Sequence, residues 1–265
     1  MRHLPNLLTL GNLFCGCLAI VCLLNAQPFL LYHPSDANAM LLQPTFEYDW
    51  VHGVQQIAWG GGLIFIAAVF DLLDGLAARA LKVHSPIGKD LDSLADLVSF
   101  GVAPAVIMYK LLWETVAAQP HITDVSLLYL APAFAIALFA ALRLAKFNIT
   151  PPQSGFSGMP TPAVGLFVAS FALLQWERPE IVEKYLSNMW VLYGIIALLC
   201  YLMVSKVHFI KMMPSKWSLA QSWPNLLLAV ASVVLLVLFR TAAIPMAFIL
   251  YILLSFVAPK VPATA

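Results

Sequence analysis

Eight long apolar stretches dominate the sequence and leave little besides the connections between them. A transmembrane helix needs about 20 mostly apolar residues, so eight spans use roughly 160 positions. Only 10% of the 265 residues are charged, against about 25% in soluble domains. We therefore predict an all-α integral membrane protein with about eight transmembrane helices and no separate soluble domain. The stretches are Asn6–Leu24, Val54–Leu81, Asp90–Leu112, Ser126–Phe147, Thr161–Trp176, Met189–Val204, Pro224–Phe239 and Ala242–Val257.

The distribution of basic residues predicts the orientation of these spans. With a cytoplasmic N-terminus, ten Lys and Arg residues fall on the cytoplasmic side and only Lys110, Arg178, Lys184 and Arg240 on the other. Cytoplasmic loops are enriched in such residues, so we expect a multi-pass protein of the cell (inner) membrane with its N-terminus in the cytoplasm. The first stretch lacks a small-residue cleavage site, and we expect it to be retained. The net charge of +1 provides no basic surface for nucleic acid.

Four aspartates are placed to meet where the second and third stretches join. Asp71 and Asp74 stand three residues apart, and Asp92 and Asp96 stand four apart. On a helix, each spacing puts both side chains on one face. The intervening segment Leu81–Lys89 contains proline and glycine and is typical of a short turn, which would make the two helices antiparallel neighbours. We therefore expect the four carboxylates to converge.

Such a cluster indicates bound divalent cations. Like charges and desolvation both disfavour ionised carboxylates in a low-dielectric place, and cations reverse that penalty. Oxygen-only ligands favour Mg²⁺ or Mn²⁺, and four carboxylates can hold two such ions. The alternative is that the aspartates cap helices or pair with Arg79, Lys82 and Lys89. For Asp90, whose spacing points it away from Asp92 and Asp96, a surface role is expected.

Residues beside the acidic cluster suit a diphosphate. Gly75 and Ala78 share the helix face of Asp71 and Asp74, and their small size leaves room for a ligand, although small residues also serve close helix packing. Arg79 offers a guanidinium fork that matches phosphate oxygens. Together these residues predict a metal-bound diphosphate site at the cytoplasmic face of a membrane.

The same segment carries a known signature, D-x-x-D-G-x-x-A-R-x8-G-x3-D-x3-D. Its fixed positions are Asp71, Asp74, Gly75, Ala78, Arg79, Gly88, Asp92 and Asp96. In this motif the chain resembles the CDP-alcohol phosphatidyltransferase family. Its members are integral membrane enzymes with a six-helix core that transfer a phosphatidyl or related group from a CDP-linked donor to an alcohol and release CMP. The resemblance implies a six-helix core over residues 1–204, and a cytoplasmic connection with two additional helices over 205–265.

Further stretches are similar to the family members that use serine as the acceptor. These are PNLLTLGNLFCG from Pro5, DSLADLVSFGVAPA from Asp92, LRLAKFN from Leu142 and GMPTPA from Gly158. The resemblance implies that CDP-diacylglycerol and L-serine are the substrates, that phosphatidylserine and CMP are the products, and that the protein is a homodimer.

The resemblance also implies roles for individual residues. Four aspartates, Asp71, Asp74, Asp92 and Asp96, would bind two divalent cations, Mg²⁺ or Mn²⁺, and Asp96 would also be the general base. Gly75 and Ala78 would flank the cytidine, and Arg79 would hold the diphosphate. Three polar residues recur at helical spacing on the first stretch and could hydrogen-bond either the nucleotide or neighbouring helices. They are Asn6, Thr9 and Asn12.

Serine recognition is expected at the cytoplasmic end of the fourth stretch. Arg143 and Lys146 are placed to meet an anionic group, and Asn148 could add a hydrogen bond. The alternative is that Arg143 and Lys146 only anchor the helix at the cytoplasmic surface.

Three other functions are compared with this prediction. Glycerol 3-phosphate or inositol phosphate as acceptor would favour more basic residues than Arg143 and Lys146. Intramembrane carboxylates also mark cation transporters, but a transporter predicts charges near the midplane and paired repeats, and no repeat is visible. A lipid-binding scaffold would leave the eight motif positions unexplained.

Overall fold

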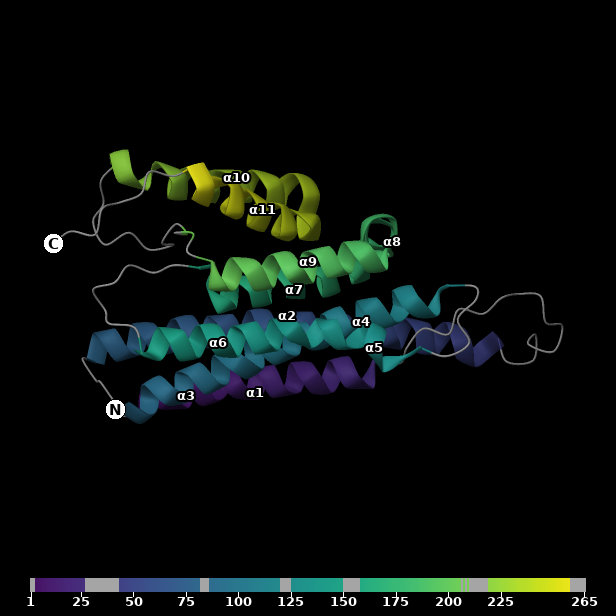
Figure 1. The fold of residues 1–265 in the computed structure, drawn as a ribbon, viewed down its shortest axis with the longest axis horizontal. Coiled ribbons are helices and arrows are strands. Elements are labelled where there is room, and N and C mark those ends of the chain that lie inside the picture. Colours follow the sequence, from purple (N-terminus) through teal and green to yellow (C-terminus); the bar gives the residue numbers. More distant parts are fainter. Residues whose placement is uncertain are drawn as a thin grey trace.

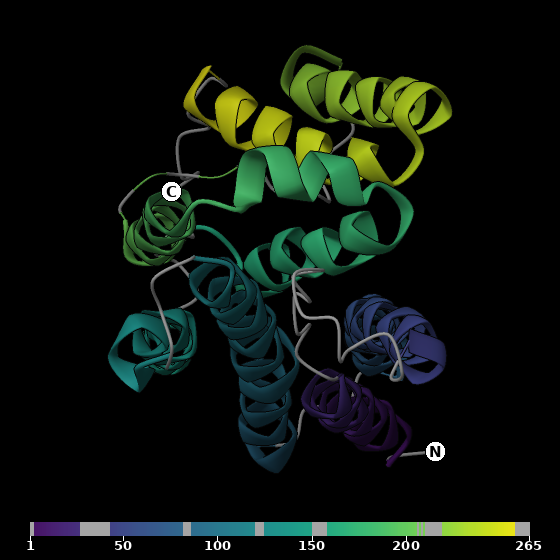
Figure 2. The same cartoon turned by 90° about the vertical axis from the view of Figure 1, so that its right-hand side faces the viewer.

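The described part of the chain is a bundle of helices. The computed structural model describes residues 3–26, 43–81, 86–119, 125–149, 158–205, 207, 209 and 219–257, and all regular secondary structure in these ranges is helical. Figures 1 and 2 show the C-terminal helix pair, α10 (Leu219–Phe239) and α11 (Ala243–Val257), as a separate layer on the side of α7 (Thr161–Glu177) and α9 (Met189–Val204). The helices are α1 (Leu4–Asn25), α2 (Gln43–Leu81), α3 (Pro86–Leu97), α4 (Ala103–Ala117), α5 (Leu127–Leu130), α6 (Ala135–Ile149), α7 (Thr161–Glu177), α8 (Pro179–Leu186), α9 (Met189–Val204), α10 (Leu219–Phe239) and α11 (Ala243–Val257).

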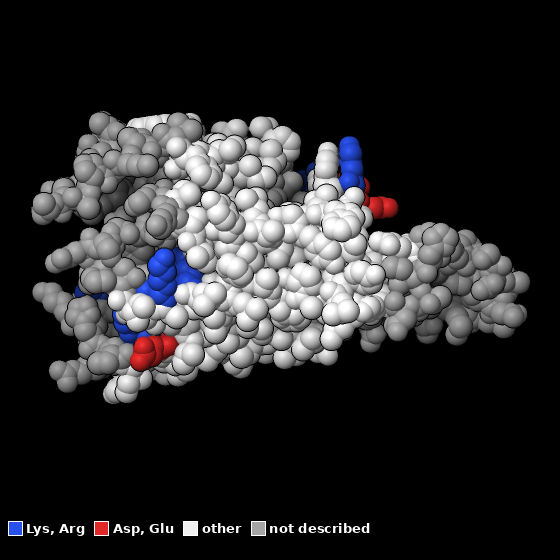
Figure 3. Space-filling model, viewed as in Figure 1, with Lys and Arg blue, Asp and Glu red and all other residues white. Residues whose placement is uncertain are grey.

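Several of these helices are long and apolar enough to cross a membrane. Within the described ranges there are five such stretches, or six if α8 and α9, which meet at a bend of 87°, form one span. One of the five, Trp223–Phe256, includes both α10 and α11. The face drawn in Figure 3 has its coloured charges toward two ends, over α3 and α6 and over α8, with an uncharged belt between them. The chain is therefore a multi-pass membrane protein, and the number of eight spans stays a prediction.

The stretch Ile87–Ala117 is the most buried of the five and is not a uniform α-helix. In Ile87–Ala117, 61% of the most apolar window is buried inside the protein, against 33% or less in the other four stretches. Its two halves, α3 and α4, are joined by a π-helical turn over Val98–Val102. Pro104 lies at the start of α4 and has no N–H to donate to the carbonyl of Phe100. The wider turn accommodates this missing hydrogen bond.

Small residues let α2 pack tightly on both of its neighbours. A Cβ on Gly60 would lie 2.7 Å from Cγ of Leu23 in α1, and a Cβ on Gly61 would lie 2.9 Å from the carbonyl oxygen of Ala169 in α7. In membranes, such small residues allow helix backbones to approach closely. Two consecutive glycines therefore fix α2 between α1 and α7.

Some helix boundaries differ from those predicted. Helix α2 begins at Gln43 and not at Val54, because hydropathy marks only the apolar part of a helix. Helix α3 begins at Pro86, so the predicted turn over Leu81–Lys89 is shorter than expected. The two helices predicted to be antiparallel neighbours make at most marginal backbone contact with each other, and both pack on α1. The short connection brings their ends together, but α1 packs along both.

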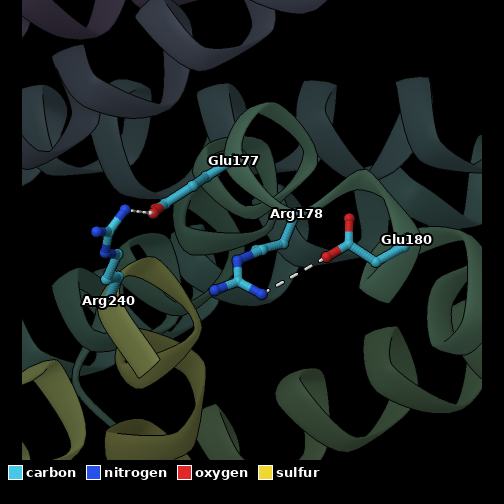
Figure 4. Close-up of polar contacts among 4 residues, drawn as sticks. All are labelled: Glu177, Arg178, Glu180 and Arg240. Atoms are coloured by element: carbon cyan, nitrogen blue, oxygen red, sulfur yellow. Dashed lines mark ion pairs between the residues drawn. The ribbon is translucent and has the colours of Figure 1, made fainter. Parts of the chain in front are cut away.

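The C-terminal helix pair is held against α7 at the turn between its helices. Residues Arg240–Ala242 form a single 3-10 turn between α10 and α11, and Arg240 has a left-handed φ of 52°. Its Nη1 lies 3.7 Å from Oε1 of Glu177 at the end of α7 (Figure 4). Nearby, Arg178 pairs with Glu180 at the same distance of 3.7 Å. Of these two ion pairs, Glu177–Arg240 links the end of α7 to the C-terminal pair, and Arg178–Glu180 links it to α8.

We predict that Gly165→Ala destabilises the bundle whereas Gly194→Ala does not. A Cβ on Gly165 in α7 would lie 2.9 Å from Cα of Phe100, a backbone atom in the π-helical turn, but one on Gly194 would meet nothing within 4 Å. Overpacking of this kind costs about 1–3 kcal/mol, whereas Gly→Ala at an open helical site gains about 0.5–1 kcal/mol. Thermal unfolding of both variants in detergent measures the difference, and equal midpoints would contradict this packing.

Candidate active site

The predicted convergence of aspartates is present. Asp71 and Asp74 near the end of α2 and Asp92 in α3 each offer one carboxylate oxygen, and these oxygens all lie within 4.8 Å of one another. Asp74 is buried, with 6% of its surface exposed, and Asp71 and Asp92 are half-buried. The fourth aspartate, Asp96, is 8% exposed and interacts with Asp71 and Asp92. Asp90 is exposed, as expected.

Helix α1 holds two of these carboxylates in place. The Thr9 hydroxyl donates a hydrogen bond of 2.7 Å to Oδ2 of Asp74. The Asn12 amide donates one of 3.2 Å to Oδ1 of Asp96. Thr9 and Asn12 lie three residues apart on one buried face of α1. Both therefore make the interhelical hydrogen bonds that were one of the two sequence alternatives, while Asn6 is half-buried at the same end of the helix.

A close approach between α1 and the π-helical turn fixes the position of Asn12 along the axis of α1. Ser99 donates a hydrogen bond of 3.0 Å to the carbonyl oxygen of Asn12. One turn further along α1, a Cβ on Gly16 would lie only 2.3 Å from the Ser99 hydroxyl oxygen. Only glycine allows this contact without movement of the backbone. The Gly16–Ser99 pair thus fixes α1 relative to the start of α4 and brings Asn12 to Asp96.

The predicted donor-binding residues lie beside the cluster on α2. A Cβ on Gly75 would meet only Nη2 of Arg79, at 3.8 Å, so the backbone there is open. Ala78 is half-buried, and Arg79 is exposed. The Nε of Arg79 donates a hydrogen bond of 3.0 Å to the carbonyl oxygen of Gly75. The open backbone and the exposed guanidinium are therefore adjacent on one helix face.

The basic residues near the cluster do not neutralise it. Arg79 bonds the carbonyl of Gly75, and Lys89 donates a hydrogen bond of 2.8 Å to the carbonyl oxygen of Asn148. Lys82 lies outside the described residues. In the described ranges, the ion pairs within 4 Å are those of Arg178 and Arg240 at the other end of α7. The alternative of aspartates paired with Arg79 or Lys89 therefore finds no support.

The structure separates the three residues predicted to bind serine. Arg143 of α6 is half-buried, and its Nη1 donates a hydrogen bond of 2.7 Å to the hydroxyl of Thr161. It also interacts electrostatically with Asp96. Asn148 is half-buried and donates a hydrogen bond of 2.8 Å to Ser93 in α3. Lys146 is exposed. Of the three, Arg143 is the one that interacts with an aspartate. Its helix α6 packs on α3, as α1 does, and Figure 2 shows α6 and α1 on opposite sides of α3.

Thr161 is a neighbour of Arg143 that the sequence analysis did not single out. It begins α7 directly after a turn in which Gly158 has a φ of +87°. A Cβ on Gly158 would lie 2.3 Å from the carbonyl oxygen of Met203, so this turn requires glycine. The backbone N–H of Met159 donates a hydrogen bond of 2.9 Å to the carbonyl of Leu202. The available signal was the GMPTPA stretch, in which glycine and two prolines mark a rigid turn.

The donor set fits a hard divalent cation. The cluster presents carboxylate oxygens without histidine or cysteine, which is the ligand chemistry of Mg²⁺ and Mn²⁺. Oδ1 of Asn12 is buried and has no hydrogen-bond partner among the described residues. An amide oxygen is a suitable ligand for a hard cation, so this unpartnered acceptor on the residue that bonds Asp96 is consistent with a metal site. The acidic cluster can therefore bind metal.

Comparison with known proteins gives one family match and several relatives. The CDP-alcohol phosphatidyltransferase family matches residues 2–203, which include the aspartates, Arg143 and Thr161 but neither α10 nor α11. The CDP-diacylglycerol–serine O-phosphatidyltransferase of Bacillus subtilis (strain 168) is 31% identical over 210 residues, which cover 79% of this chain and 90% of that protein.

Two archaeal relatives match over shorter stretches. The protein of the same name from Methanocaldococcus jannaschii is 35% identical over 150 residues, 56% of this chain and 62% of that protein. The archaetidylserine synthase of Methanothermobacter thermautotrophicus is 36% identical over 115 residues, 42% of this chain and 45% of that protein. The family match covers most of the chain and includes its whole acidic motif. The chain therefore belongs to the CDP-alcohol phosphatidyltransferase family.

Proposed function

We propose that this protein transfers the phosphatidyl group of CDP-diacylglycerol to the hydroxyl of L-serine, giving phosphatidylserine and CMP. The observation that carries the proposal is the acidic cluster, in which oxygens of Asp71, Asp74 and Asp92 lie within 4.8 Å of one another. The names of the B. subtilis and M. jannaschii relatives support serine as the acceptor. A divalent-cation transporter would share the carboxylates but not the CDP-alcohol motif.

Each helix of the cluster supplies one part of the proposed chemistry. Asp71, Asp74, Asp92 and Asp96 would hold two divalent cations, Mg²⁺ or Mn²⁺. Such ions neutralise a diphosphate and stabilise a departing phosphate in an in-line displacement. The open backbone at Gly75 and Ala78 gives the cytidine space, and Arg79 lies where its guanidinium can bind the diphosphate. Thr9 and Asn12 orient Asp74 and Asp96.

Asp96 is the proposed general base. A seryl hydroxyl is a poor nucleophile at neutral pH, so a carboxylate must take its proton as the new bond forms. The serine oxygen attacks the phosphorus that carries the diacylglycerol, and the bond from that phosphorus to the CMP oxygen breaks. The proton passes to the Asp96 carboxylate and CMP leaves with the bonding electron pair. No covalent enzyme intermediate is required.

Arg143 is the proposed anchor for the serine carboxylate. Its positive charge interacts with Asp96, so an acceptor held by its guanidinium would present its hydroxyl near the base. Asn148, which bonds Ser93, and the exposed Lys146 lie further along the same helix, so the proposed contact with serine rests on Arg143. The cytoplasmic position of the site, the inner-membrane location and the homodimer stay predictions.

The first test is a panel of acceptors. We expect CMP release from CDP-diacylglycerol with L-serine and little with glycerol 3-phosphate or inositol phosphate. The acceptor side offers few basic side chains to bind a phosphate dianion. A chelator should abolish the reaction, and Mg²⁺ or Mn²⁺ should restore it. Higher CMP release with either phosphorylated acceptor, or activity that persists in chelator, would refute the proposal. Divalent-ion uptake by vesicles without CMP formation would favour a transporter.

We predict that Asp96→Asn abolishes transfer but leaves a folded, metal-binding protein. The amide cannot accept the serine proton, and loss of a general base costs about 10²- to 10⁴-fold in rate. The other three carboxylates remain. CMP release measures activity, and Mn²⁺ titration measures metal binding. Asp90→Asn is the matched control, because Asp90 is an exposed aspartate of the same helix, and it should retain wild-type turnover.

We predict that Arg143→Ala raises the KM for serine much more than that for CDP-diacylglycerol. Hydrogen bonds to charged groups contribute about 1.5–3 kcal/mol, so the serine KM should rise about tenfold or more. Initial rates with each substrate varied in turn measure both constants. Arg178→Ala, which removes an exposed arginine at the far end of α7, should change neither. Equal increases in both constants for Arg143→Ala would count against a serine-specific role.

A further inference from the structure

Three residues join the first half of α3 to the end of α6. The side-chain amide of Asn148 in α6 donates a hydrogen bond of 2.8 Å to the hydroxyl oxygen of Ser93 in α3. Ser93 donates in turn to the carbonyl oxygen of Lys89, one turn earlier in α3, at 3.2 Å. The Nζ of Lys89 donates a hydrogen bond of 2.8 Å to the carbonyl oxygen of Asn148. These three residues therefore form a closed ring of hydrogen bonds, which we call the α3–α6 clamp.

Each bond of the clamp suits the place where it forms. The last carbonyl groups of a helix have no partner within that helix, and Asn148 lies one residue before the end of α6. A lysine ammonium stabilises such a negative helix end. A helical serine commonly donates its proton to the carbonyl four residues earlier, and Ser93 does so. Its hydroxyl oxygen is then left to accept the bond from Asn148, which links the two helices.

A second contact holds α6 nearer its middle. A Cβ on Gly101, in the π-helical turn, would lie 3.1 Å from Cβ of Ala140 in α6. Ala140 and Leu144 are buried, and with Asn148 they lie at successive intervals of four residues, on one face of the helix. Contact between such small side chains lets the helices slide past each other, whereas a hydrogen bond weakens steeply when it is misaligned. The clamp therefore fixes the position of α6 along its axis.

Residues of the proposed reaction lie on both sides of the clamp. In α3, Ser93 lies between Asp92 and Asp96. Its spacing of three residues from Asp96 places the two side chains on one side of the helix. In α6, the proposed serine anchor Arg143 lies five residues before Asn148, which is about one and a half helical turns. The distance between the anchor and the general base therefore depends on how α6 lies on α3.

We propose that Ser93 and Asn148 are positioning residues for the acceptor: their hydrogen bond holds α6 on α3, and so holds the serine anchor at a productive distance from the general base. This inference rests on the proposed function. It assigns Asn148 to the clamp, in place of the direct bond to serine that its sequence position predicts.

Direct binding of serine by Asn148 is the competing assignment. The Oδ1 atom of Asn148 is buried and has no hydrogen-bond partner among the described residues, so it could accept a bond from the serine ammonium group. The side-chain donor, in contrast, is already bonded to Ser93. The two assignments differ in what they require of Ser93: the clamp needs its hydroxyl, and direct binding does not.

The test is Ser93→Ala and Asn148→Ala, alone and combined, in the full-length protein in vesicles that contain CDP-diacylglycerol. Each change removes the same hydrogen bond between α3 and α6. We expect each single variant to raise the KM for serine about fivefold, the effect of one lost hydrogen bond. The KM for CDP-diacylglycerol should change less than twofold. The double variant should resemble the single ones, because residues that act through one another are not additive.

Two controls separate positioning from stability. Ser93→Thr keeps the hydroxyl and should keep the wild-type KM for serine. Ser126→Ala removes a hydroxyl that accepts a hydrogen bond of 3.4 Å from the backbone N–H of Leu128 at the start of α5. It should leave both KM values unchanged. A bond with only a structural role would lower the unfolding temperature of Ser93→Ala without raising its KM for serine.

The outcomes distinguish this inference from its rivals. An unchanged KM for serine in Ser93→Ala would overturn it, and a rise in Asn148→Ala alone would show that Asn148 binds serine directly. Equal increases in both KM values, or effects that simply add in the double variant, would also count against the clamp. A wild-type protein that does not use serine would instead overturn the proposed function, and this inference with it.

Discussion

Four carboxylates gathered in one part of a membrane protein repel one another, and much of the described structure serves to hold them together. Asp71, Asp74 and Asp92 approach to within 4.8 Å, and no lysine or arginine in the described ranges pairs with them within 4 Å. Like charges in a poorly solvated place cannot all remain ionised unless cations join them. The arrangement is therefore unfavourable as a purely structural device and favourable as a metal site.

Helix α1 is the element that makes this arrangement possible. Because α2 and α3 both pack on α1 and hardly on each other, α1 decides how far apart their carboxylates lie. Its hydroxyl and amide donors, Thr9 and Asn12, bind one aspartate on each helix. The close contact of Gly16 with Ser99 fixes where these donors lie along the axis of α1. The same face of α1 therefore packs closely on its neighbours and also positions the acids.

The aspartate cluster was predicted well from the sequence, and the residues that hold it in place were predicted less well. Spacings of three and four residues place side chains on one helix face whatever the surroundings, so the aspartate cluster was predictable. Whether Thr9 and Asn12 bind a ligand or another helix depends on tertiary packing, which no local pattern encodes. Charge alone did not separate the half-buried Arg143 from the exposed Lys146, one turn apart.

Under the proposed function, different helices supply the residues for the displacement chemistry and the residues for the acceptor. The carboxylates and the predicted donor-binding residues belong to α1, α2 and α3, whereas Arg143 and Thr161 belong to α6 and α7. Under the proposed function, the displacement chemistry and the choice of alcohol are then assigned to different helices, and Arg143, whose charge interacts with Asp96, is where they meet.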